Sequence, residues 1–368
     1  MKILFICGSI EKGKDGVGDY TARLCASLSI LGYNVSIISL NDPYVDTNFK
    51  TVLNSEGQAI PALRLAKSEE MNLKLDLAAQ FISEEKPDVI SLQYVVFSFN
   101  HKGLPFSLAK SLKKISNNIP WHIMFHELWV GMDKGATFKM NIWGKIQKFI
   151  IKRMVAILNP VITHTHTRLY QLKLANIGIK SNYLPLFGNI PVTAVIPHRN
   201  QRQFVVFGGI HPGAGIGDLI NLNARIKEKF KYDLKLVFVG RNGGELNQWL
   251  PLIRNSGIEV VVLGEQSLGT ISEILSQSVV GISTTPLLLA EKSGSVAAMR
   301  EHGLIILDIS RKWEVRGTDN VPIPSEMISC NDYFDNFAHT EDRNRTHPFG
   351  IAAVTQMYLN DLRGINII

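Results

Sequence analysis

The chain of 368 residues is too long for one ordinary hydrophobic core, so its length predicts two domains. Hydrophobic residues make up 45% and charged residues 19%, which excludes a disordered chain, and no apolar run approaches the roughly 20 residues that cross a bilayer. The net charge is +7, and the three cysteines, Cys7, Cys25 and Cys330, have no metal-like spacing, so we expect reduced thiols in a cytoplasmic protein.

The first elements form a predicted βαβ unit. Residues 2–9 are a nearly continuous apolar strand, 19–31 have helical periodicity, and 34–40 are a second strand. The loop between the first strand and the helix carries Gly13, Gly16 and Gly18, so a backbone can approach a ligand there. The spacing departs from the GxGxxG fingerprint, and Asp42 is not a clean ribose ligand, which disfavours a nicotinamide enzyme.

The next predicted elements place a histidine at a strand end. Helices are expected over 73–83 and 106–116, and strands over 89–94 and 121–125. His126 and Glu127 follow the last of these strands, where open α/β sheets hold catalytic groups. Because a glycine loop should lie in the same crevice, His126 is a catalytic candidate; the alternative is a hydrogen-bonded structural histidine.

The region from 101 to 200 is strongly basic, with 14 Lys or Arg against Glu127 and Asp133. The predicted helix over 139–158 has an apolar face of Trp143, Ile146, Ile150, Met154 and Ile157. Its cationic remainder is either a solvated back or a surface that contacts an anionic membrane. No aromatic residues are interleaved with the cations in a recognisable module, so nucleic-acid binding is not expected.

His164 and His166 resemble half of a metal site, but no third ligand is spaced near them, so no metal is predicted. Thr167 is expected to cap the next helix. Residues 184–191 end the first domain and 198–203 form the linker. Strand and helix patterns then alternate from 204 to 283, which predicts a second doubly wound α/β domain. The expected domains are 1–197 and 204–348, with 349–368 a final helix that packs back toward the first domain.

Residues 283–307 form a predicted strand, loop, helix and strand. Gly294 and Ser295 begin the helix, with Ser295 expected as its cap, and unpaired amides at a helix start bind anions, most simply phosphate. Glu291 precedes the helix and can accept hydrogen bonds from hydroxyl groups. Phosphate beside a polyol indicates a nucleotide sugar, whereas the simpler alternative is ordinary helix capping.

Two Rossmann-like domains with a phosphate loop in the second resemble the GT-B glycosyltransferases, specifically the retaining, nucleotide-sugar-dependent branch that includes glycosyltransferase family 4. Four stretches carry the resemblance. They are residues 16–21, His126 with Glu127, residues 184–191, and residues 291–295 with Gly303.

The resemblance implies roles for individual residues. His126 and Glu291 would act on the transferring sugar. The donor diphosphate would be bound by Gly16, Val17, Gly18, Gly209, Arg241, Lys292, Ser293, Gly294 and Ser295, and the nucleoside by Gly264, Glu265 and Glu301. In this branch fixed donors stabilise the leaving diphosphate, so neither a metal nor a cofactor is implied.

The chain also departs from the family pattern. Met299 occupies the position of the second family glutamate, and Gly209 and Ala214 occupy those of an arginine and a lysine that contact the diphosphate. We expect Arg241 or Lys292 to supply the missing charge.

The predicted function is transfer of a sugar from a nucleotide donor, with retention, to a glycan, lipid-linked or small acceptor in envelope or polysaccharide synthesis. Two alternatives remain open. One is a catalytically silent relative that acts as a binding or scaffold partner, and the other is a sugar-nucleotide epimerase. The expected location is cytoplasmic, with possible peripheral attachment to the inner face of the cell membrane.

Overall fold

The structure is a computed structural model that describes residues 1–116, 118–193, 199–317, 320–336 and 350–364. The chain forms two compact units. The first comprises Met1–Pro185, Glu314–Asn320 and Ile351–Ile368, and the second comprises Leu186–Trp313 and Val321–Gly350. The chain thus passes from the first unit to the second at 185/186, and the expected domain ends at 197 and 348 lie outside the described residues.

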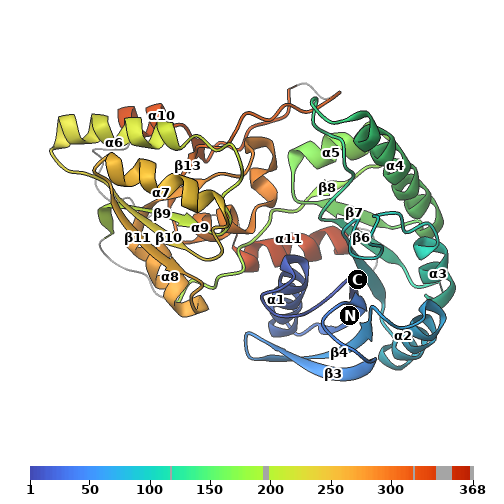
Figure 1. Ribbon diagram of the computed structural model, residues 1–368. Coiled ribbons are helices and arrows are strands. Elements are labelled where there is room, and N and C mark those ends of the chain that lie inside the picture. Colours follow the sequence, from blue (N-terminus) through green and yellow to red (C-terminus); the bar gives the residue numbers. More distant parts are fainter. Residues whose placement is uncertain (117, 194–198, 318–319, 337–349, 365–368) are drawn as a thin grey trace. The chain divides into compact units, whose positions relative to one another are not determined.

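The first unit is a mostly parallel sheet with helices (Figure 1). Its elements in chain order are β1 (Lys2–Cys7), α1 (Gly16–Ile30), β2 (Asn34–Asp42), β3 (Phe49–Ser55), β4 (Gln58–Ala66), α2 (Met71–Glu85), β5 (Val89–Tyr94), α3 (Leu108–Ile115), β6 (Trp121–Phe125), α4 (Phe138–Leu158), β7 (Ile162–Thr165), α5 (Arg168–Ala175), β8 (Asn182–Tyr183) and α11 (Ile351–Arg363).

The strand order of this sheet is β3-β4-β2-β1-β5-β6-β7-β8. Residues 51–64, which the sequence left unassigned, form most of the antiparallel β3–β4 hairpin at one edge. The chain adds strands on one side of β1 first and then on the other, starting with β5. The strand order therefore reverses between β1 and β5, which is where open α/β sheets bind ligands.

Helix α4 buries a different face from the one predicted. Ile150 and Met154 are buried as expected, but Ile146 is 36% exposed and Gln147 is fully buried in its place. A Cβ on Gly144 would come within 2.1 Å of the Val130 carbonyl oxygen. The close approach at Gly144 therefore sets the helix face, which apolar periodicity alone did not show.

The second unit is an all-parallel sheet with the strand order β11-β10-β9-β12-β13-β14, the order of the Rossmann fold. Its elements are β9 (Asn200–Phe207), α6 (Ile216–Phe230), β10 (Lys235–Val239), α7 (Glu245–Asn255), β11 (Glu259–Gly264), α8 (Leu268–Gln277), β12 (Ser278–Ser283), the 3₁₀ helix η1 (Leu287–Lys292), α9 (Gly294–Glu301), β13 (Ile305–Asp308), β14 (Met327–Ile328) and α10 (Cys330–Asn336).

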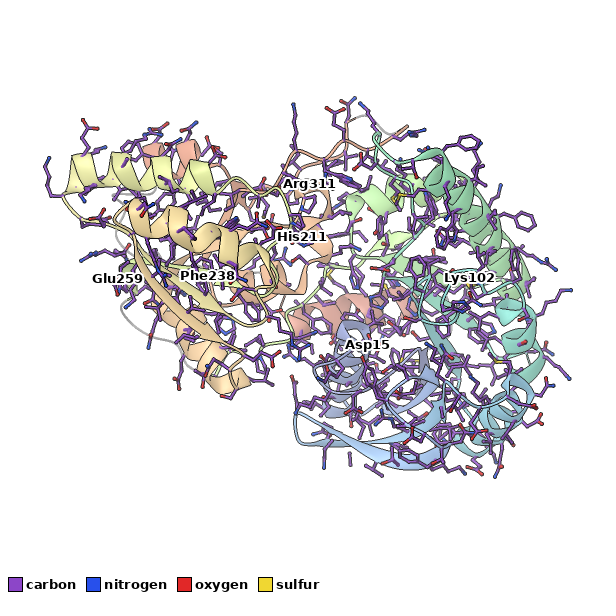
Figure 2. All side chains as sticks on the ribbon, viewed as in Figure 1. Asp15, Lys102, His211, Phe238, Glu259 and Arg311 are labelled. Atoms are coloured by element: carbon purple, nitrogen blue, oxygen red, sulfur yellow. The ribbon has the colours of Figure 1, made fainter. Side chains whose placement is uncertain are left out.

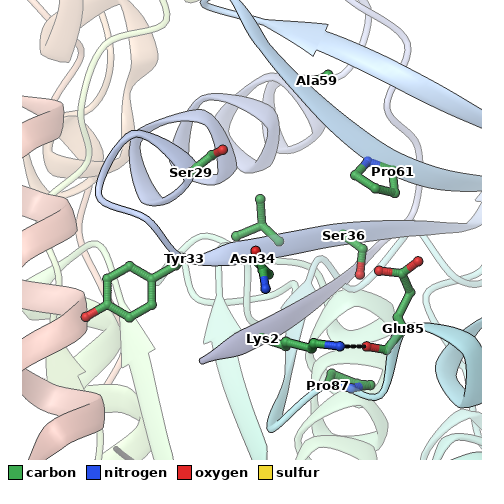
Figure 3. Close-up of a pocket in the computed structure, with 10 residues that line it drawn as sticks. Lys2, Ser29, Tyr33, Asn34, Ser36, Ala59, Pro61, Glu85 and Pro87 are labelled. Carbon is green, nitrogen blue, oxygen red and sulfur yellow. Dashed lines mark hydrogen bonds between the residues drawn. The ribbon is translucent and has the colours of Figure 1, made fainter.

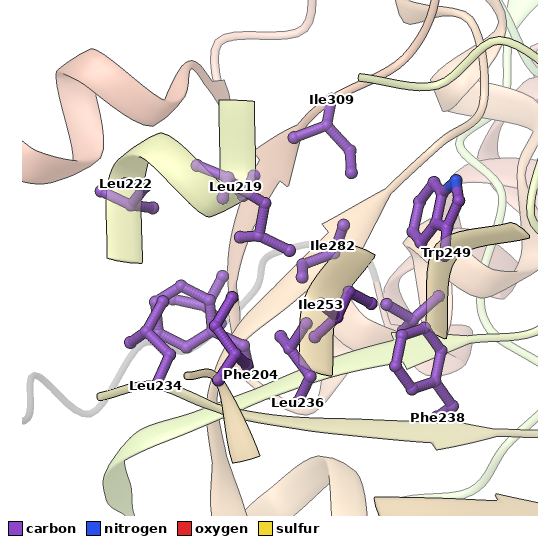
Figure 4. Packing of buried hydrophobic residues seen from close by; sticks show 14 of the residues in the cluster. Phe204, Leu219, Leu222, Leu234, Leu236, Phe238, Trp249, Ile253, Ile282 and Ile309 are labelled. Carbon is purple, nitrogen blue, oxygen red and sulfur yellow. The ribbon is translucent and has the colours of Figure 1, made fainter. Parts of the chain in front are cut away.

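The alternating side chains of each strand in the second unit build two apolar layers. Phe204 and Phe238 face one layer with Leu219 of α6 and Trp249 of α7 (Figure 4). Tyr333 of α10 belongs to the same cluster. The neighbouring residues Val205 and Val237 face the other layer, which α8 and α9 cover. Burial on both faces explains why these strands appear as continuous apolar runs in the sequence. The order reverses between β9 and β12, so the two strand ends there mark the expected ligand position.

Among the described residues, no helix combines the length and the apolar character needed to cross a bilayer.

Candidate functional site

The strand ends of β9 and β12 meet the start of α9 in the second unit. Gly208 follows β9 with φ +81°, and a Cβ there would lie 2.5 Å from the Ser295 hydroxyl oxygen. The Thr284 hydroxyl, just beyond β12, accepts a hydrogen bond from the His211 amide at 3.0 Å. The loop after β9 is therefore held directly against the first turn of α9, and a side chain at Gly208 would separate them.

The cap of α9 is Ser293, two residues earlier than the Ser295 that we predicted. The Ser293 hydroxyl accepts from the Val296 amide at 3.4 Å and from the Thr285 hydroxyl at 3.2 Å. Ser295 lies inside the helix instead. The amides of Gly294 and Ser295 belong to the first turn, where no intrahelical carbonyl is within reach, so the helix start keeps its capacity to bind an anion.

Two cationic side chains, Arg311 and Lys292, lie near His211 beside this helix start. Burial lowers the pKa of His211, and the positive charges of Arg311 and Lys292 lower it further. Arg311 also lies against the glycine loop, since a Cβ on Gly213 would come within 3.4 Å of its Cδ. Figure 2 marks His211 and Arg311 on neighbouring loops of this unit. Lys292 ends η1, one residue before the Ser293 cap. Lys292 thus lies where the sequence predicted a diphosphate ligand. Arg311 is a second cation nearby, which the sequence did not predict.

Arg241, the other predicted source of positive charge, is paired with Glu265 instead. Both side chains are 62% exposed. A partner carboxylate on an exposed loop neutralises the guanidinium, which makes Arg241 a weaker candidate for the diphosphate than the sequence alone indicated. Glu265, one of the predicted nucleoside ligands, is engaged by Arg241 in this pair.

Glu301 and Met299 both have structural roles in the second unit. One Glu301 carboxylate oxygen accepts a hydrogen bond from the Gly188 amide at 2.8 Å, so this predicted nucleoside ligand fixes the chain at the start of the second unit. Met299 is fully buried beneath Gly281, where a Cβ would meet the Met299 sulfur at 2.5 Å. A carboxylate at position 299 would therefore lie in the apolar core.

The glycine loop of the first unit ends at a carboxylate that caps α1. Asp15 precedes α1, and one of its oxygens accepts from the Val17 amide at 2.9 Å and the Gly18 amide at 3.2 Å. These two predicted diphosphate ligands are thus occupied in this structure. A Cβ on Gly18 would lie 2.5 Å from the Ser9 carbonyl oxygen, which gives this glycine a packing role, whereas Gly16 has open space around its Cα.

His126 lies just after β6 and is 7% exposed. Its Nε2 lies 2.8 Å from Gln93 Oε1 on β5, and its Nδ1 lies 3.1 Å from Nε2 of His166. The Tyr20 ring of α1 meets the His126 ring edge-on at 5.0 Å. Both ring nitrogens are therefore held by protein groups, so the orientation of the imidazole is fixed.

A cavity of about 290 Å³ opens at the reversal between β1 and β5. It is lined by Gly8, Ser9, Lys14, Asp15, Gly16, Asn41, Pro43, Tyr44, Lys67, Phe97, Ser98 and His101. A second cavity, of about 260 Å³, is lined by residues such as Lys2, Asn34 and Pro87 at the amino ends of the strands (Figure 3). Ligands of open α/β sheets bind at the carboxyl ends, so the first cavity is the candidate site.

No group of three or more histidine, cysteine or acidic side chains suited to a metal ion occurs among the described residues. His164 and His166 contact other side chains of the first unit instead, and Thr167 caps α5 by accepting from the Tyr170 amide at 2.9 Å.

Sequence reasoning missed Arg311, His211 and Gln93. Arg311 follows β13 and His211 follows β9, so each carried the signal of a polar residue just beyond a buried strand. Gln93 is a polar residue within the apolar β5 strand, which marks a buried side chain that needs a hydrogen-bond partner.

No family model matches this chain, and no curated protein matches it. Solved structures do. A sucrose-phosphate synthase from Thermosynechococcus elongatus has a TM-score of 0.58 at 14% identity, covering 99% of this chain and 94% of its own. HepE from Anabaena, solved with UDP and glucose, has a TM-score of 0.57 at 14% identity, covering 99% of this chain and 100% of its own.

An enzyme described as a putative UDP-N-acetylglucosamine 2-epimerase, from Listeria monocytogenes, matches with a TM-score of 0.52 at 10% identity, covering 99% of this chain and 96% of that one. Similarity at this level of identity establishes the fold and not the activity. The two parallel α/β units, matched over nearly the whole chain, show that this protein has the GT-B fold.

Proposed function

We propose that this protein is a glycosyltransferase that transfers a sugar from a nucleotide diphosphate donor to a glycan, lipid-linked or small acceptor. One observation carries the proposal. Lys292 directly precedes the Ser293 cap of α9, and Arg311 and Lys292 both act on the pKa of His211 in the loop after β9, beside the point where the strand order reverses between β9 and β12. Helix-start amides backed by cations favour a diphosphate.

The same groups supply the chemistry that such a transfer needs. The bond between the anomeric carbon and the diphosphate oxygen breaks, a bond to an acceptor oxygen forms, and negative charge grows on the leaving diphosphate. Arg311, Lys292 and the amides of Gly294 and Ser295 can stabilise that charge. Glu291 lies on η1, just before α9, and its carboxylate is proposed to accept hydrogen bonds from the sugar hydroxyls. We infer that no metal is needed and that configuration is retained.

The first unit is proposed to bind the acceptor in the 290 Å³ cavity. Lys14, Lys67 and His101 line it together with Tyr44 and Phe97, so the cavity offers hydrogen-bond donors and an aromatic surface. Polar donors with an aromatic wall suit a sugar or an anionic acceptor. His126, with its fixed orientation, is proposed to contact the transferring sugar.

Isothermal titration of the intact chain with UDP, GDP, ADP and dTDP tests the donor site. We expect binding of at least one diphosphate, unchanged by EDTA, and weakened by Arg311→Ala. Absence of binding by all four would refute the proposed donor site.

Activity separates the proposal from its alternatives. Transfer by the purified protein, lost in Glu291→Ala and with the product anomer identified by NMR, supports a retaining transferase. One matched structure is described as a putative epimerase, so the donor is also incubated without acceptor. Inversion of the donor sugar under those conditions would favour an epimerase, and binding without any turnover would favour a catalytically silent partner protein.

We further propose that α4 attaches the protein to an anionic membrane from the cytoplasmic side, as expected for an envelope or polysaccharide acceptor. Phe138 is 80% exposed and Phe149 57% exposed, and Lys145 and Lys152 are exposed on the same helix. Exposed aromatic and cationic residues on one helix favour the bilayer interface.

Vesicle sedimentation tests this attachment. Binding to vesicles with anionic lipid should exceed binding to neutral vesicles and should weaken as the salt concentration rises. Removal of each lysine that contacts the membrane should weaken the binding free energy by about 1 kcal/mol. The double variant Lys145→Gln/Lys152→Gln should bind less, whereas Lys227→Gln in α6 should not change binding. Equal binding to neutral and anionic vesicles at low salt would contradict the proposal.

A further inference from the structure

Six side chains of the first unit form one continuous hydrogen-bonded chain, which we call the histidine relay. It runs through His166, His126, Gln93, Ser91, His122 and His164. One end is the Leu184 backbone carbonyl, and the other end is the Asp361 carboxylate on α11.

Seven short contacts join these groups. In order from Leu184 to Asp361 they measure 2.9, 3.1, 2.8, 2.7, 2.7, 3.0 and 2.7 Å. Each imidazole uses one ring nitrogen for each neighbour. All are within the range of genuine hydrogen bonds, so each contact needs one proton between its two heavy atoms.

The relay is buried except at one end. His164 is fully buried, His122 is 1% exposed, His166 2% and His126 7%. The Asp361 side chain is 34% exposed. Tyr20 covers the His126 and His166 rings edge-on, and Tyr358 covers His122 edge-on. A buried contact between two acceptors without a proton would be repulsive, so all seven contacts should hold one.

Counting donors shows a deficit of one proton. The carbonyl and the carboxylate donate none. A neutral histidine offers one N–H, a serine one O–H, and the Gln93 amide one N–H to one neighbour while its oxygen accepts from the other. Four histidines, Ser91 and Gln93 thus supply six protons for seven contacts. An additional proton, carried as one imidazolium, completes the chain.

The orientation of the Gln93 amide does not change this count. With its nitrogen toward Ser91, the half from Ser91 to Asp361 is satisfied by neutral histidines, and the extra proton belongs to the His126–His166 pair. With its oxygen toward Ser91, the neutral half is the one ending at Leu184, and the extra proton belongs to His164, beside Asp361.

We propose that the histidine relay holds one imidazolium in its buried interior, at the His126–His166 pair or at His164 according to the orientation of Gln93. In the second orientation the His126–His166 pair holds one proton fewer than in the first, and His164, beside Asp361, holds one more. His122 carries its single proton on the other ring nitrogen, so the total number of protons in the relay is the same in both orientations.

The groups around the relay fit a single positive charge. Asp361 from α11 faces His164, and the hydrogen bond from His164 lowers the pKa of this carboxyl, with a further contribution from Asn182. Burial and the neighbouring His164 depress the pKa of His122, which keeps the middle ring neutral.

The titratable groups packed around the relay are neutral. Burial raises the pKa of Tyr20 on α1, of Tyr358 on α11 and of Cys25, so both phenols and the thiol keep their protons.

The consequence for catalysis rests on the proposed function. If His126 contacts the transferring sugar, the relay decides whether it presents a positive charge there, and Gln93, His166 and Asp361 are positioning residues. Their replacement should lower kcat with little effect on KM, because a charge acting on the leaving group is felt in the transition state.

NMR of ¹⁵N-histidine-labelled protein at pH 8 tests the proposal without any substrate. Long-range ¹H–¹⁵N spectra distinguish imidazolium from the two neutral tautomers, and single His→Gln variants assign the signals. Exposed histidines have pKa values of about 6.5 and are therefore neutral at pH 8. We expect one imidazolium equivalent among His122, His126, His164 and His166. Four neutral rings in the unaltered protein would overturn the proposal.

Asp361→Asn gives the sharpest variant, because the new amide can donate the missing proton to His164 once the Asn182 amide, which donates to the same Asp361 oxygen at 3.2 Å, turns its oxygen toward it. All four histidines should then be neutral, with the proton on Nδ1 of each. Asp76→Asn, at an exposed position of α2, is the matched control and should retain the imidazolium. An imidazolium that persists in Asp361→Asn would contradict the proton count. The NMR result stands whether or not the protein proves to be a transferase.

Discussion

Arg311 shows how a charge that sequence reasoning missed can lie beside a predicted site. Arg241, the arginine predicted from sequence, is paired with Glu265, whereas Arg311 lies 70 positions later and is placed against the same glycine loop as His211. Positive charge close to the helix start matters more than position along the chain, because electrostatic attraction falls with distance and with solvent screening.

Arg311→Ala should weaken binding of the preferred nucleoside diphosphate by about 1.5–3 kcal/mol, or roughly 10- to 150-fold, since a charge-assisted contact with phosphate is lost. Arg241→Ala should change binding less than about threefold, because that guanidinium is exposed and already paired. Titration calorimetry on both variants measures the difference. A larger loss in Arg241→Ala would reverse the assignment.

His302 predicts a pH dependence of stability. It is 3% exposed, its Nδ1 lies 2.7 Å from the Ala298 carbonyl oxygen, and burial lowers its pKa below the ordinary 6.5. The unfolded chain therefore binds more protons than the folded chain below pH 6.5, and the free energy of unfolding falls as the pH drops from there toward the folded pKa.

Urea denaturation between pH 8 and pH 5 measures this effect. His302→Asn should be less stable at pH 8, where it loses the packing of the ring, but should lose less stability on acidification, by up to about 1.4 kcal/mol for each pH unit below 6.5. His101→Asn, at an exposed position, should follow the unaltered protein. Parallel curves for all three proteins would show that His302 does not titrate with unfolding.

At the scale of elements, close backbone approaches determine which glycines matter. Gly144 in α4 lies against the Val130 carbonyl, while Gly217 in the first turn of α6 has open space around its Cα. Both are helical glycines, so helix propensity favours alanine by about 1 kcal/mol at either position.

Gly144→Ala should nevertheless destabilise the protein by about 1–3 kcal/mol, because the added methyl group would force the helix away from the Val130 loop. Gly217→Ala should be neutral or stabilising by a few tenths to about 1 kcal/mol. Thermal and urea unfolding of the two variants provide the comparison. A stabilised Gly144→Ala protein would mean that α4 can shift at little cost.

At the scale of the whole molecule, the first unit is completed by the end of the chain. Helix α11 lies against α1 (Figure 1), and Val354, Tyr358, Leu359 and Leu362 of this helix are almost completely buried. The Thr355 hydroxyl also donates to the Ser27 hydroxyl at 2.9 Å. A core built from residues as far apart as the 328 positions between Ser27 and Thr355 cannot form until both ends are present.

A chain that stops after Gly350 should therefore lose soluble expression or a cooperative unfolding transition for the first unit. The milder Tyr358→Ala variant should lose about 3–5 kcal/mol, as expected for a large buried aromatic residue, whereas Gln356→Ala on the exposed side of α11 should be close to neutral. Limited proteolysis followed by mass spectrometry shows which unit unfolds first. Preferential loss of the second unit would contradict this assignment.

Much of the element order followed from local sequence. The strands β5 and β6 have the predicted bounds, and the helix and strand alternation from β9 to β12 agrees within a few residues, because buried parallel strands are apolar on both faces and helices have their own period. The β3–β4 hairpin was not predicted, since Phe49 and Val52 are exposed and its alternation is weak.

The sequence alone determined two doubly wound α/β units and placed a helix start near Gly294, the proposed anion site, because periodicity, glycine loops and capping residues act over short distances. Only the tertiary structure decided which charges surround that helix start, since Arg311 and His211 come from separate loops. It also decided that α11 completes the first unit and that six side chains from β5, β6, β7 and their ends join into one buried relay. Those facts depend on contacts between residues far apart in the chain, which no local pattern encodes.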